Sequence, residues 1–186
     1  MQLNIPNALT IFRIVAIPLI ILVFFLPVSW ARPASGCLFV LAGVTDWLDG
    51  YLARRLGQTS KFGAFLDPVA DKLIISTALV LLVQSDPRVI FSMIAVIIIG
   101  REIAVSALRE WMAELGERGQ VAVTFFGKWK TTVQIIGISL MLYQDDLLGL
   151  PIYGIGIAFM LVAAGLTLWS MIDYLRTAWP MMIGRD

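Results

Sequence analysis

Long apolar stretches, separated by short polar connections, follow one another along the whole chain. Six of them are long enough to cross the roughly 30 Å hydrocarbon core of a bilayer as helices, which takes about 20 residues each. The expected helices cover approximately residues 8–26, 33–55, 64–84, 88–115, 121–143 and 151–175. This pattern predicts an all-α integral membrane protein with six transmembrane helices, forming one membrane-embedded domain over residues 1–186.

Composition strengthens this prediction and excludes several kinds of chemistry. Hydrophobic residues make up 59% of the chain, above the usual 45–50% of a soluble domain. The chain has no histidine, which excludes a Ser-His-Asp triad and histidine-bound zinc. Because Cys37 is the only cysteine, a thiolate metal cluster is excluded as well. Any bound metal must therefore have oxygen ligands, which favours Mg²⁺, Mn²⁺ or Ca²⁺.

The distribution of basic residues predicts the orientation in the membrane. With six spans, both termini and two loops share one side, and the three remaining loops lie on the other. The first side carries Arg54, Arg55, Lys61, Arg109, Arg118, Arg176 and Arg185, and the second only Arg32 and Arg88. Since loops rich in Lys and Arg stay in the cytoplasm, we expect both termini to be cytoplasmic.

Four aspartates form two pairs inside the second and third expected spans. An ionised carboxylate near the bilayer centre costs about 2.5–3.5 kcal/mol on insertion scales, so four together require a cation. Asp46 and Asp49 lie three residues apart on one helix, and Asp67 and Asp71 lie four apart on the next, so each pair shares a face. If these faces are aimed at each other, they form a carboxylate cage for divalent metal.

Small and basic residues accompany the aspartates. Gly50, Ala53 and Gly63 leave room beside the carboxylates, and Arg54 and Lys61 at the cytoplasmic mouth are suited to holding phosphate. Small residues at this spacing are equally typical of plain helix packing.

Ionisable residues on four helices lie at a common depth. Thirteen residues separate each member of this set from the outer end of its helix, which is about 20 Å at 1.5 Å per residue. The set comprises Asp46, Asp71, Arg101 and Lys130. We therefore expect one polar layer in the cytoplasmic third of the membrane.

The aspartates belong to a longer pattern, Asp46-x2-Asp49-Gly50-x2-Ala53-Arg54-x8-Gly63-x3-Asp67-x3-Asp71. This pattern resembles the signature of the CDP-alcohol phosphatidyltransferases, with every defining position present. Further segments are similar to the bacterial branch that makes phosphatidylglycerol phosphate, so the resemblance covers nearly the full length. These segments are Asn4-Ile5-Pro6-Asn7-x2-Thr10, Gly100-Arg101-Glu102-Ile103, Ser106-Ala107-Leu108-Arg109-Glu110 and Gly127-Lys128-x-Lys130-Thr131.

The resemblance implies a reaction between CDP-diacylglycerol and sn-glycerol 3-phosphate, giving phosphatidylglycerol phosphate and CMP. It implies two Mg²⁺ or Mn²⁺ ions bound by Asp46, Asp49, Asp67 and Asp71, with Asp71 also acting as the general base. It assigns CDP-diacylglycerol binding to Asn7, Thr10, Gly50, Ala53, Arg54, Ser60 and Gly63. It further implies the family's fold, a homodimer, and a place in the bacterial cytoplasmic membrane with the active site facing the cytoplasm.

Glycerol phosphate is an anion, so its pocket needs fixed cations. We expect these to be Arg101, Arg118, Lys128 and Lys130. Alternatively, Arg101 pairs with Glu102, the outer basic residues contact anionic lipid, and Lys72 pairs with a carboxylate.

Two rival functions remain open. One is a sister transferase with another alcohol acceptor, such as serine or inositol, against which the basic residues of the fourth and fifth helices argue. The other is a cation transporter that uses the same carboxylates, against which their common depth argues. We expect no nucleic-acid partner under any of these functions.

Overall fold

Six helices make up the structure, a computed structural model that describes residues 5–56, 61–114 and 125–182. They are α1 (Ile5–Phe24), α2 (Ala31–Leu56), α3 (Lys61–Ser85), α4 (Val89–Glu114), α5 (Phe125–Tyr143) and α6 (Ile152–Met182). The predicted all-α architecture with six helices is therefore confirmed.

The main difference from the predicted bounds lies at the end of the last helix. We expected this helix to end near residue 175, whereas α6 continues to Met182. About 20 helical residues span the hydrocarbon core, and α6 has 31. The helix is therefore long enough to extend beyond the hydrocarbon region. Pro18 in α1 and Pro68 in α3 do not end their helices, as is common in membrane helices whose neighbours satisfy the freed backbone groups.

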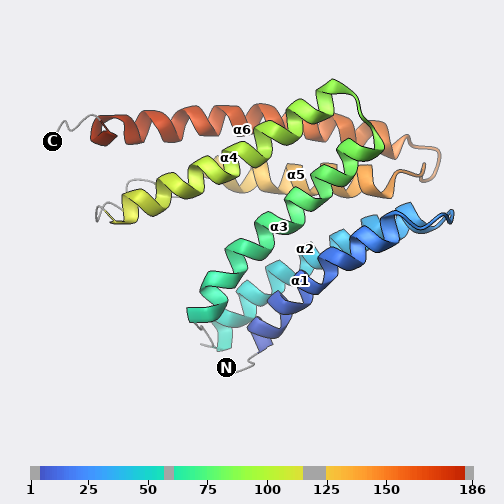
Figure 1. Ribbon diagram of the computed structural model, residues 1–186, viewed down its shortest axis with the longest axis horizontal. Helices are drawn as coiled ribbons and strands as arrows, with labels where there is room; N and C mark the ends of the chain where they lie inside the picture. Colours follow the sequence, from blue (N-terminus) through green and yellow to red (C-terminus); the bar gives the residue numbers. More distant parts are fainter. Residues whose placement is uncertain (1–4, 57–60, 115–124, 183–186) are drawn as a thin grey trace.

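The helices run up and down between two ends of the molecule. The α1–α2, α3–α4 and α5–α6 connections lie at one end, on the right of Figure 1, while the start of α1 and the end of α6 lie at the other. Helix α1 packs against α2 and α3, α6 packs against α4 and α5, and α2 packs against α5. The three N-terminal and three C-terminal helices thus form two groups joined mainly through α2, α3 and α5.

Apolar side chains occupy both the interior and the outer surface. Ile98 and Ile138 are fully buried, whereas Val96 and Trp169 are more than 70% exposed. Among the described residues, α1, α4 and α6 are long and apolar enough to cross a membrane. In the described part of the chain, the buried polar and charged residues come from α1, α2, α4, α5 and α6, and they include Arg13, Arg101 and Lys130. This distribution is that of a membrane protein whose outer surface faces lipid.

Glycines allow the helices to approach closely at two places. A Cβ atom on Gly36 would lie 2.8 Å from the backbone nitrogen of Tyr143, where α2 meets α5. A Cβ atom on Gly156 would lie 3.0 Å from the backbone nitrogen of Met141, where α6 meets α5. Because lipid is as apolar as a leucine side chain, such close packing is a main source of helix association in membranes.

A polar cluster joins the α3–α4 turn to the start of α6. Asp86 accepts hydrogen bonds from Arg88 Nε and Nη2, at 2.8 and 2.6 Å, and from the Tyr153 hydroxyl at 2.7 Å. The hydrogen bond from Arg88 is the largest cause that lowers the pKa of Asp86 to about 2. A carboxyl with a lowered pKa stabilises the fold at neutral pH, and this contribution is lost progressively as pH falls from the ordinary pKa of 3.8 through about 2.

We predict that Gly36→Ala destabilises the protein, because the added methyl group meets backbone atoms of Tyr143 and separates α2 from α5. A loss of about 1–3 kcal/mol, typical of overpacking, is expected in thermal unfolding of the detergent-solubilised protein. Gly165→Ala is the matched control, since no heavy atom lies within 4 Å of its added Cβ. Equal stability of the two variants would contradict this account of the α2–α5 contact.

Candidate active site

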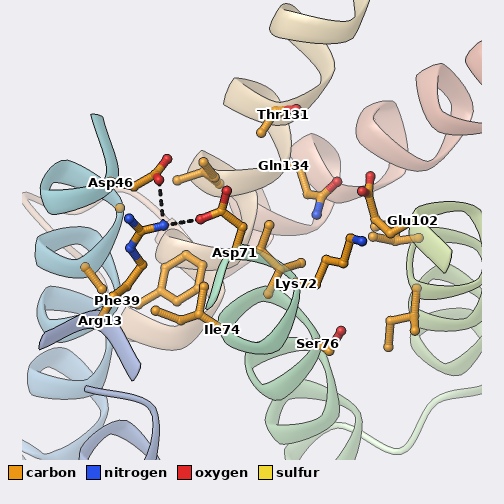
Figure 2. Close-up of a pocket in the computed structure, with 16 residues that line it drawn as sticks. Arg13, Phe39, Asp46, Asp71, Lys72, Ile74, Ser76, Glu102, Thr131 and Gln134 are labelled. Carbon is orange, nitrogen blue, oxygen red and sulfur yellow. Dashed lines mark hydrogen bonds and ion pairs between the residues drawn. The ribbon is translucent and has the colours of Figure 1, made fainter. Parts of the chain in front are cut away.

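A cavity of about 220 Å³ lies between the two groups of helices and is lined by residues of α1 to α5. Its floor is apolar and includes Phe39, Ile74 and Ile98. Its polar residues are Arg13, Asp46, Asp71, Lys72, Ser76, Glu102, Thr131 and Gln134 (Figure 2). The cavity thus brings acidic and basic side chains from sequence-distant helices to one place.

Arg13 joins two of the predicted metal ligands. Its side chain is 1% exposed, and its Nη1 atom lies 2.5 Å from Asp46 Oδ1 and also contacts Asp71 Oδ1 (Figure 2). The expected meeting of acids from α2 and α3 is therefore observed, but with a cation from a third helix between them. Because both carboxylates contact one guanidinium atom, Arg13 offsets the repulsion between their like charges.

Arg13 is not among the predicted site residues, although the sequence contains a signal for it. It is the only charged residue of α1, and a charged residue in an otherwise apolar membrane helix marks a functional or paired position. It also follows Asn7 and Thr10 at helical spacing, which places all three on one side of α1.

A second contact between α1 and α3 lies one turn away. The Thr10 hydroxyl donates a hydrogen bond of 2.6 Å to Asp67 Oδ1, and Thr10 is fully buried. Asn7 is also buried, at 5% exposure. The pairs Thr10–Asp67 and Arg13–Asp71 therefore hold one polar side of α1 against the aspartate face of α3.

A second charged cluster borders the cavity from α4 and α5. Glu102 Oε1 accepts hydrogen bonds from Arg101 Nη1 at 2.8 Å and from Lys130 Nζ at 2.9 Å. Arg101 Nη2 also donates to Ser170 Oγ of α6 at 2.8 Å. Both cations are at least 92% buried, so Glu102 offsets much of the cost of removing their charges from water. The alternative pairing of Arg101 with Glu102 is thus the one observed.

The four residues of the predicted polar layer fall into two charged clusters beside one cavity. Asp46 and Asp71 meet through Arg13, while Arg101 and Lys130 meet through Glu102. Depth counted along separate helices therefore identified residues that the fold brings together. Which residues pair across the layer did not follow from depth.

Several predicted site residues lie partly or wholly outside the described structure. For five of them, which lie on α2 or α5, the structure describes the helix but not the side chain. These five are Asp49, Gly50, Ala53, Arg54 and Lys128. Ser60 and Arg118 lie outside the described residues. Gly63 is buried in α3, near the start of the helix.

The described donors fit a divalent cation in chemistry. Asp46 and Asp71 direct carboxylate oxygens at a single positively charged atom, and oxygen is the ligand that Mg²⁺ and Mn²⁺ prefer. Among the described residues, no three acids are grouped closely enough to hold an ion. The predicted fourth ligand, Asp49, is not among the side chains described, so a complete ligand set stays a prediction.

Comparison with known proteins gives a match over nearly the whole chain. The family model described as CDP-alcohol phosphatidyltransferase matches residues 3–169. Several curated relatives, all named CDP-diacylglycerol–glycerol-3-phosphate 3-phosphatidyltransferase, align with this chain over 96% of its length. The relative from Sodalis glossinidius is 52% identical over 96% of both chains. The relative from Pseudomonas fluorescens is 51% identical over 96% of this chain and 91% of its own. The Escherichia coli K12 relative is 49% identical over 96% of both.

We predict that Arg13→Met destabilises the protein, because Asp46 and Asp71 are left as neighbouring like charges. Loss of hydrogen bonds to charged groups suggests about 1.5–3 kcal/mol, measured by thermal unfolding without divalent metal. Arg109→Met is the control, since Arg109 is an exposed residue that donates to the Tyr174 hydroxyl at 2.7 Å. If both variants lose the same stability, Arg13 has no special part in holding the carboxylates.

Proposed function

Because the chain belongs to the CDP-alcohol phosphatidyltransferase family, we propose that it transfers the phosphatidyl group of CDP-diacylglycerol to sn-glycerol 3-phosphate. The products are phosphatidylglycerol phosphate and CMP. The observation that carries this proposal is the identity of about 50% over nearly full length to relatives named for this reaction. The convergence of Asp46 and Asp71 at a cavity inside the membrane-embedded fold supports it.

In the proposed reaction, a glycerol hydroxyl oxygen attacks the phosphorus that carries the diacylglycerol. The bond from this phosphorus to the bridging oxygen breaks, and CMP leaves with that oxygen. The hydroxyl proton passes to a base, for which Asp71 is suited, because it lines the cavity and the chain has no histidine. Phosphoryl transfer depends mainly on positioning and charge stabilisation, so no covalent protein intermediate is required.

We further propose that two Mg²⁺ or Mn²⁺ ions are bound by Asp46, Asp49, Asp67 and Asp71. Divalent ions supply positive charge that stabilises the pyrophosphate and the leaving group. Arg13 contributes a fixed positive charge beside the same carboxylates. The Thr10 hydroxyl orients Asp67 through its 2.6 Å hydrogen bond.

The two substrates are assigned to different sides of the site. CDP-diacylglycerol binding is proposed for Asn7, Thr10, Gly50, Ala53, Arg54, Ser60 and Gly63. Glycerol phosphate binding is proposed for Arg101, Arg118, Lys128 and Lys130. Arg101 and Lys130 already share Glu102, which tempers the positive charge that they offer to a substrate.

The cellular setting follows from the membrane-spanning helices and the basic loops. We propose a multi-pass protein of the bacterial cytoplasmic membrane, with its active site facing the cytoplasm and membrane lipids around it. Homodimer formation, which the family resemblance implies, stays a prediction.

The decisive assay follows CMP release by the purified, detergent-solubilised protein. Release is expected with CDP-diacylglycerol, glycerol 3-phosphate and Mg²⁺ together, and not when either substrate is left out. Faster release with serine or inositol would instead identify a sister transferase. Ion flux in proteoliposomes without any CMP release would identify a transporter.

We predict that a chelator abolishes CMP release and that added Mg²⁺ or Mn²⁺ restores it. The same ions should raise the melting temperature, because a ligand that binds only the folded state stabilises it. Undiminished release in excess chelator would refute the metal proposal.

We predict that Asp71→Asn lowers the turnover number by about 10²–10⁴, the usual contribution of a general base, while CDP-diacylglycerol still binds. Turnover is measured by CMP release and binding by the thermal shift that CDP-diacylglycerol produces. Asp173→Asn is the control, since Asp173 is an exposed residue of α6 that does not line the cavity. Wild-type turnover of Asp71→Asn would remove the assignment of the base.

A further inference from the structure

Lys72 differs from the other buried or half-buried cations around the cavity. Arg13 contacts Asp46 and Asp71, and Lys130 contacts Glu102. Lys72 also lines the cavity and is half-buried, yet within the described parts of the chain it makes no ion pair or hydrogen bond. A half-buried ammonium group without an acid partner is costly, and such a group at a cavity is suited to an anionic ligand.

The position of Lys72 on α3 separates it from the aspartate face. Successive residues of a helix point about 100° apart, so Asp71 and Lys72 face different neighbours. Figure 2 shows Asp71 turned toward Arg13, and Lys72 turned toward Glu102 and Gln134. The Lys72 ammonium group therefore lies on the α4–α5 side of the cavity, away from the carboxylates proposed to hold the donor.

We propose that Lys72 binds the phosphate group of the acceptor. This inference rests on the proposed function and adds to it a residue outside the predicted glycerol phosphate set. The acceptor carries a hydroxyl and a phosphate at opposite ends of a three-carbon chain. A base and a cation at adjacent positions on one cavity wall match these two groups, with Asp71 at the hydroxyl and Lys72 at the phosphate.

Lys72 is better placed than Arg101 or Lys130 to contact the phosphate first, because these two cations are already bound to Glu102. Arg101 and Lys130 share one Glu102 oxygen, and Arg101 also donates to Ser170. A phosphate that binds these cations directly must compete with a carboxylate already in place. Lys72 is turned toward Glu102 but forms no ion pair with it, and within the described residues its ammonium group is bound to no carboxylate. A charge-assisted hydrogen bond from this group to phosphate is among the stronger ones.

The test is steady-state kinetics of CMP release for Lys72→Met, Lys72→Gln and Lys72→Arg. With the ammonium group removed, the KM for glycerol 3-phosphate should rise about 10- to 100-fold, the cost of a lost hydrogen bond between charged groups. The KM for CDP-diacylglycerol should stay within about twofold, and Lys72→Arg should retain most of the acceptor affinity. Ser76→Ala is the matched control, because Ser76 lines the same cavity one turn further along α3.

The kinetics distinguish a failure of the Lys72 assignment from a failure of the proposed function. An unchanged KM for glycerol 3-phosphate, or an equal rise in the KM of both substrates, would overturn the role of Lys72. Absence of CMP release by the wild-type protein would instead refute the proposed function. If Lys72→Met does not fold, the thermal shift produced by glycerol 3-phosphate on Lys72→Gln decides, and a shift of wild-type size would overturn the inference.

Discussion

The whole arrangement depends on the need to match each buried cation with a carboxylate. Arg13, Asp46 and Asp71 satisfy this need on one side of the cavity, and Glu102, Arg101 and Lys130 satisfy it on the other. An unmatched charge in a medium of low dielectric constant costs several kilocalories per mole. These pairings therefore constrain how five helices sit around the cavity, although they occupy a small part of the interior.

Apolar packing places the helices so that these pairings become possible. Gly36 lets α2 approach the backbone of α5 near the end at which the α5–α6 connection lies, and Gly156 does the same for α6. Toward the other end, the group of α1, α2 and α3 diverges from the group of α4, α5 and α6 (Figure 1), and the cavity is lined by residues of both groups. Close helix contact at one end and the charged residues around the cavity are thus two parts of one packing arrangement.

The two charged clusters divide the work of the proposed reaction. The cluster around Arg13 contains the carboxylates suited to metal and to the nucleotide-linked donor. The cluster around Glu102 holds cations suited to an anionic acceptor. Residues 71 and 72 connect them, because one side chain faces each cluster from the same turn of α3. In the proposed reaction, this turn of α3 would lie between the donor and the acceptor.

The sequence by itself determined the helices, the polar layer and the aspartate motif, because periodicity, apolar length and spacing are local properties. Asp46 and Asp71 were identified from spacing and the cost of burying charge, and the structure brings them together. Partner choice was decided only by the tertiary structure. Nothing local to Arg13 shows that it reaches both aspartates, and nothing local to Lys72 shows that its neighbours leave it unpaired among the described residues. Such contacts depend on the rotation and crossing of helices that are distant in the chain, and packing against several neighbours sets these at once.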